Sequence, residues 1–260
     1  GNSNLKTGLA TPGFMQLLML SPEQEKRWTL TDATGGKDQL KPPRIAFANW
    51  LTDVEQGAGQ LLARVIVNRL WQHHFGRGIV STPSDFGIQG ERPTHPQLLD
   101  YLATELIRGG WKLKPIHKLI MSGSVYMQTS ESNDAGVQAD PANKLWWRRP
   151  ARRMEAEVIR DSMLAISGTL DHKMFGPGSL NQQDRRRSVY LKVKRGTLIP
   201  MLQLFDAPDA MQGIGQRTIT TVPPQALAMM NSPFVRQLAE QFSKRVRPNA
   251  DKSLEQTVDD

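Results

Sequence analysis

Residues 64–111 hold the densest group of side chains that could do acid–base or metal chemistry. The candidates are Arg69, His73, His74, Asp85 and His95. A neutral imidazole beside a carboxylate suits zinc, nickel or iron, so His73 or His74 meeting Asp85 or His95 would form a metal site or an acid–base pair. Adjacent histidines on a helix point about 100° apart and do not easily share one ion. We therefore expect no metal, and we interpret these histidines as ending a helix, where protonated imidazole interacts with the negative pole.

A second group of charged residues falls on one face of a predicted helix. Arg153, Glu157 and Arg160 are spaced i, i+4 and i+7, so Glu157 can pair with either arginine. Asp161 adjoins them, and Arg217 follows in a turn-rich segment. Two interpretations stay open: a salt-bridge ladder, or a carboxylate held between cations to bind a polar ligand. Paired carboxylates could also hydrolyse a glycosidic bond, but sequence spacing does not give their separation.

The fingerprints of common catalytic sites are absent from the chain. There is no G-x-S-x-G, H-E-x-x-H, P-loop or G-x-G-x-x-G pattern. The tripeptide Asp85-Phe86-Gly87 matches a kinase signature, but the catalytic loop and phosphate loop of kinases are missing. The chain has no cysteine, which excludes disulfides, thiol catalysis, Cys-ligated zinc and a C-x-x-C-H haem attachment. We expect no cofactor in this chain.

Basic residues gather near residues 187–195, where alternating side chains predict a short β-strand. Val189, Leu191 and Val193 are expected on one face, with Tyr190 and the lysines on the other. The strand could contact phosphates or sulfates while Tyr190 stacks on a base or a sugar. The alternative is an exposed edge strand that its charges protect from aggregation.

Hydrophobic periodicity predicts helices through most of the remaining chain. The expected helices cover residues 43–51, 59–74, 95–108, 115–120, 150–168, 224–230 and 232–245. Thr94 is the expected N-cap of the third helix, and residues 130–145 are an expected polar loop. In the helix from Pro150, the side chains expected to face inward are Met154, Val158, Ile159, Met163 and Leu164.

The expected fold class is therefore mainly α, a multi-helix domain with a small β element near residues 187–195. Residues 1–42 are expected to form a lead-in segment. Residues 43–260 are expected to form one mainly helical domain truncated at its C-terminus, because DKSLEQTVDD begins a helix without completing an apolar face.

Composition favours an anionic partner. The 33 Lys and Arg residues outnumber the 25 Asp and Glu residues, for a net charge of +8, which favours nucleic acid, an acidic glycan or an acidic membrane surface. The cations form no dense tract and match no nucleic-acid module, so nucleic acid is the least favoured partner. No segment has the roughly 20 apolar residues of a membrane span, and the N-terminus lacks a signal-peptide pattern.

Several blocks, in this order, resemble a planctomycete-type domain of unknown function found C-terminally in large exported proteins that resemble cytochrome c. The blocks are RIAFANWLT, ARVIVNRLWQHHFGRGIVSTPSDFG, PTHPQLLDYLATELIRGGWKLKPIHKLI, DPANKLWWRRPARRMEAEVIRDSMLAISGTLD, RRSVYLKVKR, FDAPDA and RTITTVPPQALAMMNSPFV. The resemblance covers about residues 44–245, departs from the family at GAGQLLARV, and implies a periplasmic or cell-surface setting near polysaccharide breakdown or electron transfer. It supplies no catalytic residues.

The resemblance and the charge together lead to a functional expectation. We expect a binding or scaffold module of an exported multidomain protein, with an acidic polysaccharide or a neighbouring domain as partner. The alternative is a carbohydrate-active hydrolase that uses His, Asp or Glu groups; nucleic-acid binding is the weakest of the three. The candidate binding residues inside the matching blocks are Arg69, His73, Asp85, His95, Arg153, Glu157, Arg160, Asp161 and Arg217.

Overall fold

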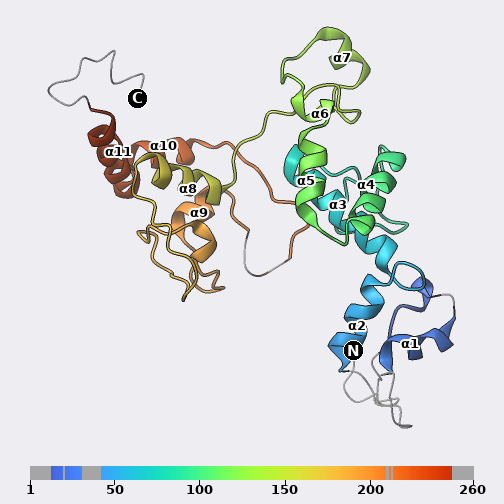
Figure 1. Cartoon of the computed structure of the whole chain (residues 1–260). Helices are drawn as coiled ribbons and strands as arrows, with labels where there is room; N and C mark the ends of the chain where they lie inside the picture. Colours follow the sequence, from blue (N-terminus) through green and yellow to red (C-terminus); the bar gives the residue numbers. More distant parts are fainter. Residues whose placement is uncertain (1–12, 20, 31–41, 209–210, 212, 248–260) are drawn as a thin grey trace, which may run out of the picture. The chain divides into compact units, whose positions relative to one another are not determined.

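The structure, a computed structural model, describes residues 13–19, 21–30, 42–208, 211 and 213–247. Within these residues the chain is mainly α-helical, as predicted (Figure 1). The chain divides into two compact units, Gly1–Ala151 and Arg152–Asp260. The single domain predicted over residues 43–260 stays a prediction, and DKSLEQTVDD lies outside the described residues.

The two units contain the following elements in chain order. Unit 1 contains η1 (Gln16–Leu18), η2 (Pro22–Gln24), α1 (Glu25–Thr29), α2 (Pro43–Thr52), α3 (Gly59–Phe75), α4 (Pro96–Arg108), α5 (Leu113–Met121), α6 (Ser124–Met127) and α7 (Asp134–Ala139). Unit 2 contains α8 (Ala156–Ile166), η3 (Ser188–Tyr190), α9 (Pro200–Leu204), α10 (Pro223–Asn231) and α11 (Pro233–Val246).

The described part of the lead-in packs on α2. The ring of Phe14 stacks on Trp50 with centroids 5.3 Å apart and meets Trp28 edge-on at 5.7 Å. Asp53, which ends α2, accepts hydrogen bonds from Trp28 Nε1 at 3.0 Å and Arg27 Nε at 3.1 Å. This small aromatic cluster therefore fixes α1 to the end of α2.

The core of unit 1 lies between α3 and α4. Ala63, Val67, Trp71 and Phe75 recur every fourth residue of α3, so they share one buried face. They pack against a matching apolar face of α4 and against α5. Gly76 ends α3 in the left-handed conformation, with φ of +84°, where glycine carries no steric penalty.

Three expectations for unit 1 need correction. The N-cap of α4 is His95 rather than Thr94, because the Thr94 hydroxyl donates to the Ile79 carbonyl instead. The predicted polar loop at residues 130–145 contains α7, whose start is capped by Asn133 Oδ1 accepting from the Gly136 N–H at 2.7 Å. The helix expected from Pro115 begins two residues earlier, at Leu113.

The core of unit 2 is built by α8, α9 and α11, and α8 differs from its prediction. The helix begins at Ala156, not Pro150, because Glu155 has extended backbone angles. Its buried stripe is Ala156, Arg160 and Leu164 at four-residue spacing, whereas Met154 is 55% and Val158 46% exposed. Ile159, Met163 and Leu164 pack in the core as predicted, whereas the predicted positions Met154 and Val158 are wrong.

The small β element near residues 187–195 forms isolated bridges, not a continuous strand. Leu191 bridges Ser179 in parallel, Lys194 bridges Thr197, and residues 188–190 form the 3-10 turn η3. The predicted alternation is wrong at two positions: Leu191 is buried, but Val189 and Val193 are 73% and 77% exposed. A 3-10 turn has three residues per turn, so it breaks the two-residue period of a strand.

Among the described helices, none is both long and apolar enough to cross a membrane.

Candidate functional site

The four candidate residues of unit 1 have separate local roles. Arg69 and His73 are exposed on α3. Asp85 caps its own loop, with Oδ1 accepting from the Gly87 N–H at 2.7 Å. His95 Nδ1 lies 3.0 Å from the hydroxyl of neighbouring Thr94. Among the described residues, no three His, Asp or Glu side chains gather in a way that could hold a metal ion.

Sequence reasoning missed the residue that positions this loop, Asn68. Its side chain is fully buried, donating from Nδ2 to the Val80 carbonyl at 3.0 Å and accepting the Val80 N–H on Oδ1 at 2.8 Å. Gly78 lies so close that a Cβ there would come within 2.6 Å of Asn68 Nδ2. The signal available in the sequence was the amide side chain of Asn68 among the apolar residues of α3.

A histidine pair was also missed. His74 Nε2 lies 2.8 Å from Nδ1 of His117 on α5, 43 residues further along the chain. The sequence predicts His74 at a helix end or beside Asp85 or His95, whereas its partner in the structure is His117. Their proximity depends on how α3 and α5 pack, which no local pattern encodes.

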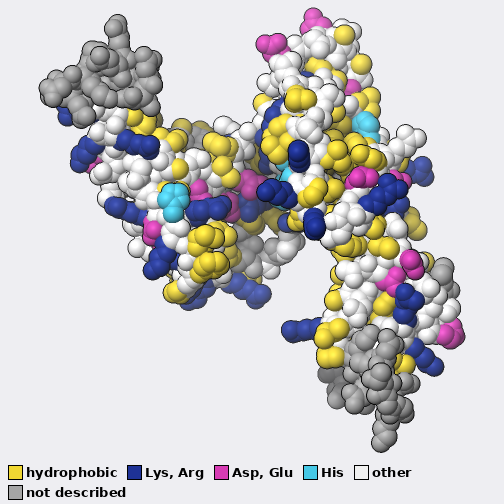
Figure 2. Space-filling model, in the orientation of Figure 1, with side chains coloured by type: hydrophobic (Ala, Val, Ile, Leu, Met, Phe, Trp, Pro, Cys, Tyr) yellow, Lys and Arg dark blue, Asp and Glu magenta, His cyan; other side chains and the backbone are white. Residues whose placement is uncertain are grey.

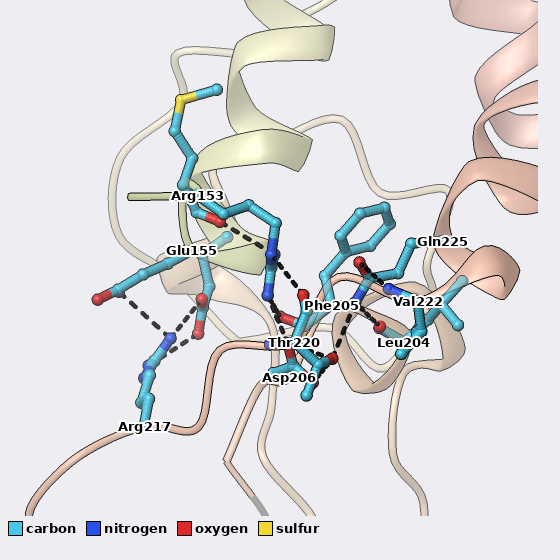
Figure 3. Close-up of polar contacts among 11 residues, drawn as sticks. Arg153, Glu155, Leu204, Phe205, Asp206, Arg217, Thr220, Val222 and Gln225 are labelled. Carbon is cyan, nitrogen blue, oxygen red and sulfur yellow. Dashed lines mark hydrogen bonds and ion pairs between the residues drawn. The ribbon is translucent and has the colours of Figure 1, made fainter. Parts of the chain in front are cut away.

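Five predicted residues gather in unit 2 around the start of α8. The first is Arg153, whose Nη2 lies 2.5 Å from Asp206 Oδ2 (Figure 3). Arg153 also donates from Nε to the Thr220 carbonyl at 3.1 Å, and its guanidinium lies 5.6 Å from the Phe205 ring centroid. Arg153 therefore ties three separate segments together.

Asp206 completes this connection. The Thr220 N–H donates to Oδ2 at 2.8 Å and the Thr220 hydroxyl to Oδ1 at 2.8 Å. These bonds and the charge of Arg153 hold the pKa of Asp206 below its ordinary value. Asp206 has a φ of +62°, a left-handed conformation that Asp and Asn adopt more readily than most residues. The turn at Asp206 thus carries a carboxylate that binds Thr220 of the 213–222 segment.

Glu157 and Arg217 form a bidentate ion pair. Arg217 Nη1 donates to Oε2 at 2.7 Å and Nη2 to Oε1 at 3.1 Å, and Glu155 adds a contact at 3.3 Å. Burial alone would raise the pKa of Glu157, but hydrogen bonds and charge from Arg217 bring that pKa below its ordinary value. The same pair raises the pKa of Arg217. Glu157 is therefore ionised near neutral pH, which is unsuitable for a general acid.

Arg160 is fully buried and binds the backbone of the following loop. Its Nη1 donates to the Arg186 carbonyl at 3.0 Å and to Ser188 Oγ at 3.2 Å, and its Nη2 donates to the carbonyls of Gln182 and Asp184. Burial lowers the pKa of this guanidinium, while Asp161 and Asp184 raise it. An arginine stays charged after such a shift.

Asp161 supports the same loop from the next position of α8. Its Oδ1 accepts from the Ser188 N–H at 2.7 Å and from the Ser188 hydroxyl at 2.6 Å. The single polar face predicted for Arg153, Glu157 and Arg160 is wrong, because Arg153 precedes α8 and Arg160 lies on its buried face. Arg160 instead points into the unit and holds a loop.

A cavity of about 200 Å³ adjoins the Glu157–Arg217 pair. Its walls are mostly apolar, with Leu191, Ile199 and Leu202 among the lining residues, and Lys192 contributes a cation. Both members of the ion pair are already bound to each other, so the cavity offers shape and one lysine rather than an acid–base pair.

The strongest concentration of charge lies in the segment that Arg160 and Asp161 hold, residues 171–198, which we name the basic loop. It contains seven Lys or Arg residues and two Asp residues, a net charge of +5 out of the +8 of the chain. Both carboxylates accept hydrogen bonds within the loop, Asp171 from the Lys173 N–H and Asp184 from the Arg186 N–H. In Figure 2, dark-blue side chains lie among yellow ones over this part of unit 2.

An exposed aromatic ring lies at the tip of the basic loop. Phe175 is 75% exposed and has a φ of +66°, an uncommon conformation for a bulky residue. The Tyr190 hydroxyl accepts its N–H at 2.9 Å, and Arg186 donates to the Phe175 carbonyl at 3.3 Å and to the Pro177 carbonyl at 2.9 Å. Tyr190, which the sequence offers as one possible stacking residue, lies under the Arg186 guanidinium at 4.9 Å and helps fix the tip.

The family of proteins of unknown function termed PSD1 (DUF1553) matches residues 43–260, and the chain belongs to this family. The match spans the basic loop and all nine candidate residues. Searches of curated proteins and of solved structures gave no match.

Proposed function

We propose that the chain is a binding module of an exported protein and that its basic loop binds an acidic polysaccharide. The observation that carries this proposal is the net charge of +5 on 28 consecutive residues whose two carboxylates are already bonded within the loop. Six of its cations are exposed: Lys173, Arg185, Arg187, Lys192, Lys194 and Arg195. Sulfate or uronate groups spaced along a polymer match such a surface.

The tip of the loop supports a sugar ligand. A ring can lie against the apolar face of a sugar while neighbouring cations bind its anionic groups, and Phe175 is held outward beside them. Arg160 and Asp161 restrain the loop from the buried side, which lowers the entropy lost on binding. Periplasmic or cell-surface location, which the sequence resemblance implies, would bring the module into contact with such polymers.

The test is binding of the full chain to dextran sulfate and to polygalacturonate, with uncharged dextran as control polymer. The variant Lys192→Glu/Lys194→Glu/Arg195→Glu should weaken binding at least about tenfold at low salt, because each cation near an anionic surface contributes about 1 kcal/mol. The matched control is Lys112→Glu/Lys114→Glu/Lys118→Glu, which makes the same change of charge at exposed positions of α5 and its N-cap. Equal losses of binding in the two variants would show that the polymer responds to the net charge of the chain and not to the basic loop.

The contribution of the ring is tested separately with Phe175→Asn. Asn tolerates positive φ, so this variant removes the ring while keeping the backbone of the tip. We expect about fivefold weaker binding, with the loss persisting at higher salt because stacking is screened less than charge. Absence of binding to both acidic polymers at low salt would overturn the proposal, and binding to a neighbouring acidic domain or to DNA would then be examined with the same variants.

A further inference from the structure

The histidine pair of unit 1 is arranged differently from an ordinary surface contact. His74 lies in the last turn of α3 and His117 in α5, and both side chains are half-buried. Their ring centroids are 5.1 Å apart and their planes are inclined by 66°. The two rings therefore meet through facing nitrogens, Nε2 of His74 and Nδ1 of His117, at 2.8 Å.

The surrounding aromatic residues hold the rings in place. Tyr126 contacts His74 edge-on with centroids 5.6 Å apart, and it contacts Phe75 in the same way at 6.0 Å. The guanidinium of Arg149 covers the Tyr126 ring at 4.0 Å and donates to the Tyr126 carbonyl at 3.1 Å. Since Phe75 belongs to the buried core, the position of the pair is set by packing.

The spacing of the facing nitrogens is close to that of two ligands on one metal ion. Nitrogens bound at about 2.0–2.1 Å lie about 2.9 Å apart when the angle at the metal is 90°, and about 3.4 Å apart when it is tetrahedral. The observed 2.8 Å, which is the length of a hydrogen bond between the rings, lies within about 0.1 Å of the 90° spacing. Copper(II) and nickel(II) prefer that angle, and copper(II) has the highest affinity of the divalent series for nitrogen ligands.

We propose that His74 and His117 form a two-imidazole site for copper(II), with nickel(II) as the weaker alternative. Each ring binds as the neutral form through its facing nitrogen. The proton that one facing nitrogen carries in the hydrogen-bonded pair moves through solvent to the other nitrogen of the same ring, so no net proton is released. Water completes the coordination, since no third His, Asp or Glu of the described residues joins the pair. The proposal is independent of the polysaccharide site, which lies in unit 2.

The experiment is a titration of the metal-stripped full chain with copper(II), followed by calorimetry and electron paramagnetic resonance. We expect one site whose spectrum shows two coordinated imidazole nitrogens. Affinity should fall about tenfold or more in His74→Ala and in His117→Ala. The matched controls are His73→Ala, next to the site on α3, and His172→Ala in unit 2, and both should keep the affinity and the spectrum.

Folding of the His73, His74 and His117 variants is checked by tryptophan fluorescence, which reports unit 1 because all six tryptophans lie there. The number of coordinated imidazole nitrogens in the spectrum of the unmodified chain tests the proposal even if a variant fails to fold. A spectrum with fewer than two imidazoles, or an unchanged copper affinity in the folded His117→Ala chain, would overturn it.

Discussion

Arg217 binds the carboxylate of Glu157 through two parallel hydrogen bonds, of 2.7 and 3.1 Å, although the two residues lie 60 positions apart. A bidentate pair of this kind is directional as well as strong. It fixes the segment around Arg217 against the start of α8, next to the cavity that Glu157 helps to line.

Glu157→Gln should destabilise unit 2 by about 1–3 kcal/mol, because it removes a charge-assisted pair and leaves a half-buried guanidinium without its carboxylate. Glu155→Gln is the control, since Glu155 contacts Arg217 at 3.3 Å and Arg152 at 3.5 Å and is not the partner in the bidentate pair. We would measure hydrogen exchange of the α8 amides under native conditions. Equal protection in the two variants would show that the bidentate geometry adds nothing.

Asp206 and Glu157 should make unit 2 sensitive to acid. Both pKa values are lowered in the folded chain, so their stabilising effect is present above the unfolded values of about 3.9–4.3. It is lost as pH falls through the lower folded values. Exchange protection of α8 and α9 should therefore fall below about pH 5. Asp206→Asn, which suits the left-handed backbone, should show a shallower decline; an unchanged pH profile would contradict this assignment.

Asn68→Ala should destabilise unit 1 by about 2–3 kcal/mol, because it leaves the buried N–H and carbonyl of Val80 without their side-chain partners. Urea unfolding followed by tryptophan fluorescence measures this effect in unit 1. Arg69→Ala, one residue later on the exposed face of α3, should change stability by less than about 0.5 kcal/mol. A similar loss in both would assign the effect to helix propensity instead.

Arg160→Met should loosen the basic loop while preserving much of the side-chain volume. Trypsin should then cleave after Arg185, Arg186 or Arg187 about tenfold faster, because opening of the loop no longer breaks the bonds to its carbonyls. Arg160→Lys should not restore protection, since one ammonium cannot replace the fork of a guanidinium. Arg236→Met, on the exposed side of α11, is the control, and equal cleavage in all three variants would refute the anchoring role.

The helices could be predicted where their signals are local. The apolar stripe of α3 and the glycine after it are read directly from neighbouring residues, and the structure has both. Arg160 shows the limit of this approach. Because Arg160 is charged, the sequence predicts it on a solvent-facing side of the helix. The carbonyls that make its burial favourable come from residues 22–26 positions away.

In the candidate site too, local features could be predicted and long-range contacts could not. Pairing of Glu157 with an arginine was predicted from helical spacing, yet the partner is Arg217 rather than Arg153 or Arg160. The start of α8 was placed too early because the bonds of Arg153 to Thr220 and Asp206 hold the preceding residues extended. Contacts across 53 or more positions have no periodic trace in the sequence.

Arg160 holds the basic loop mainly through main-chain carbonyls, which every amino acid possesses. Substitutions at exposed positions of the loop can therefore accumulate during evolution without altering its path. Members of the family can diverge in the side chains they present, and hence in ligand preference, while inheriting one scaffold. Sequence variation among relatives should accordingly be high at residues 192–195 and low at position 160.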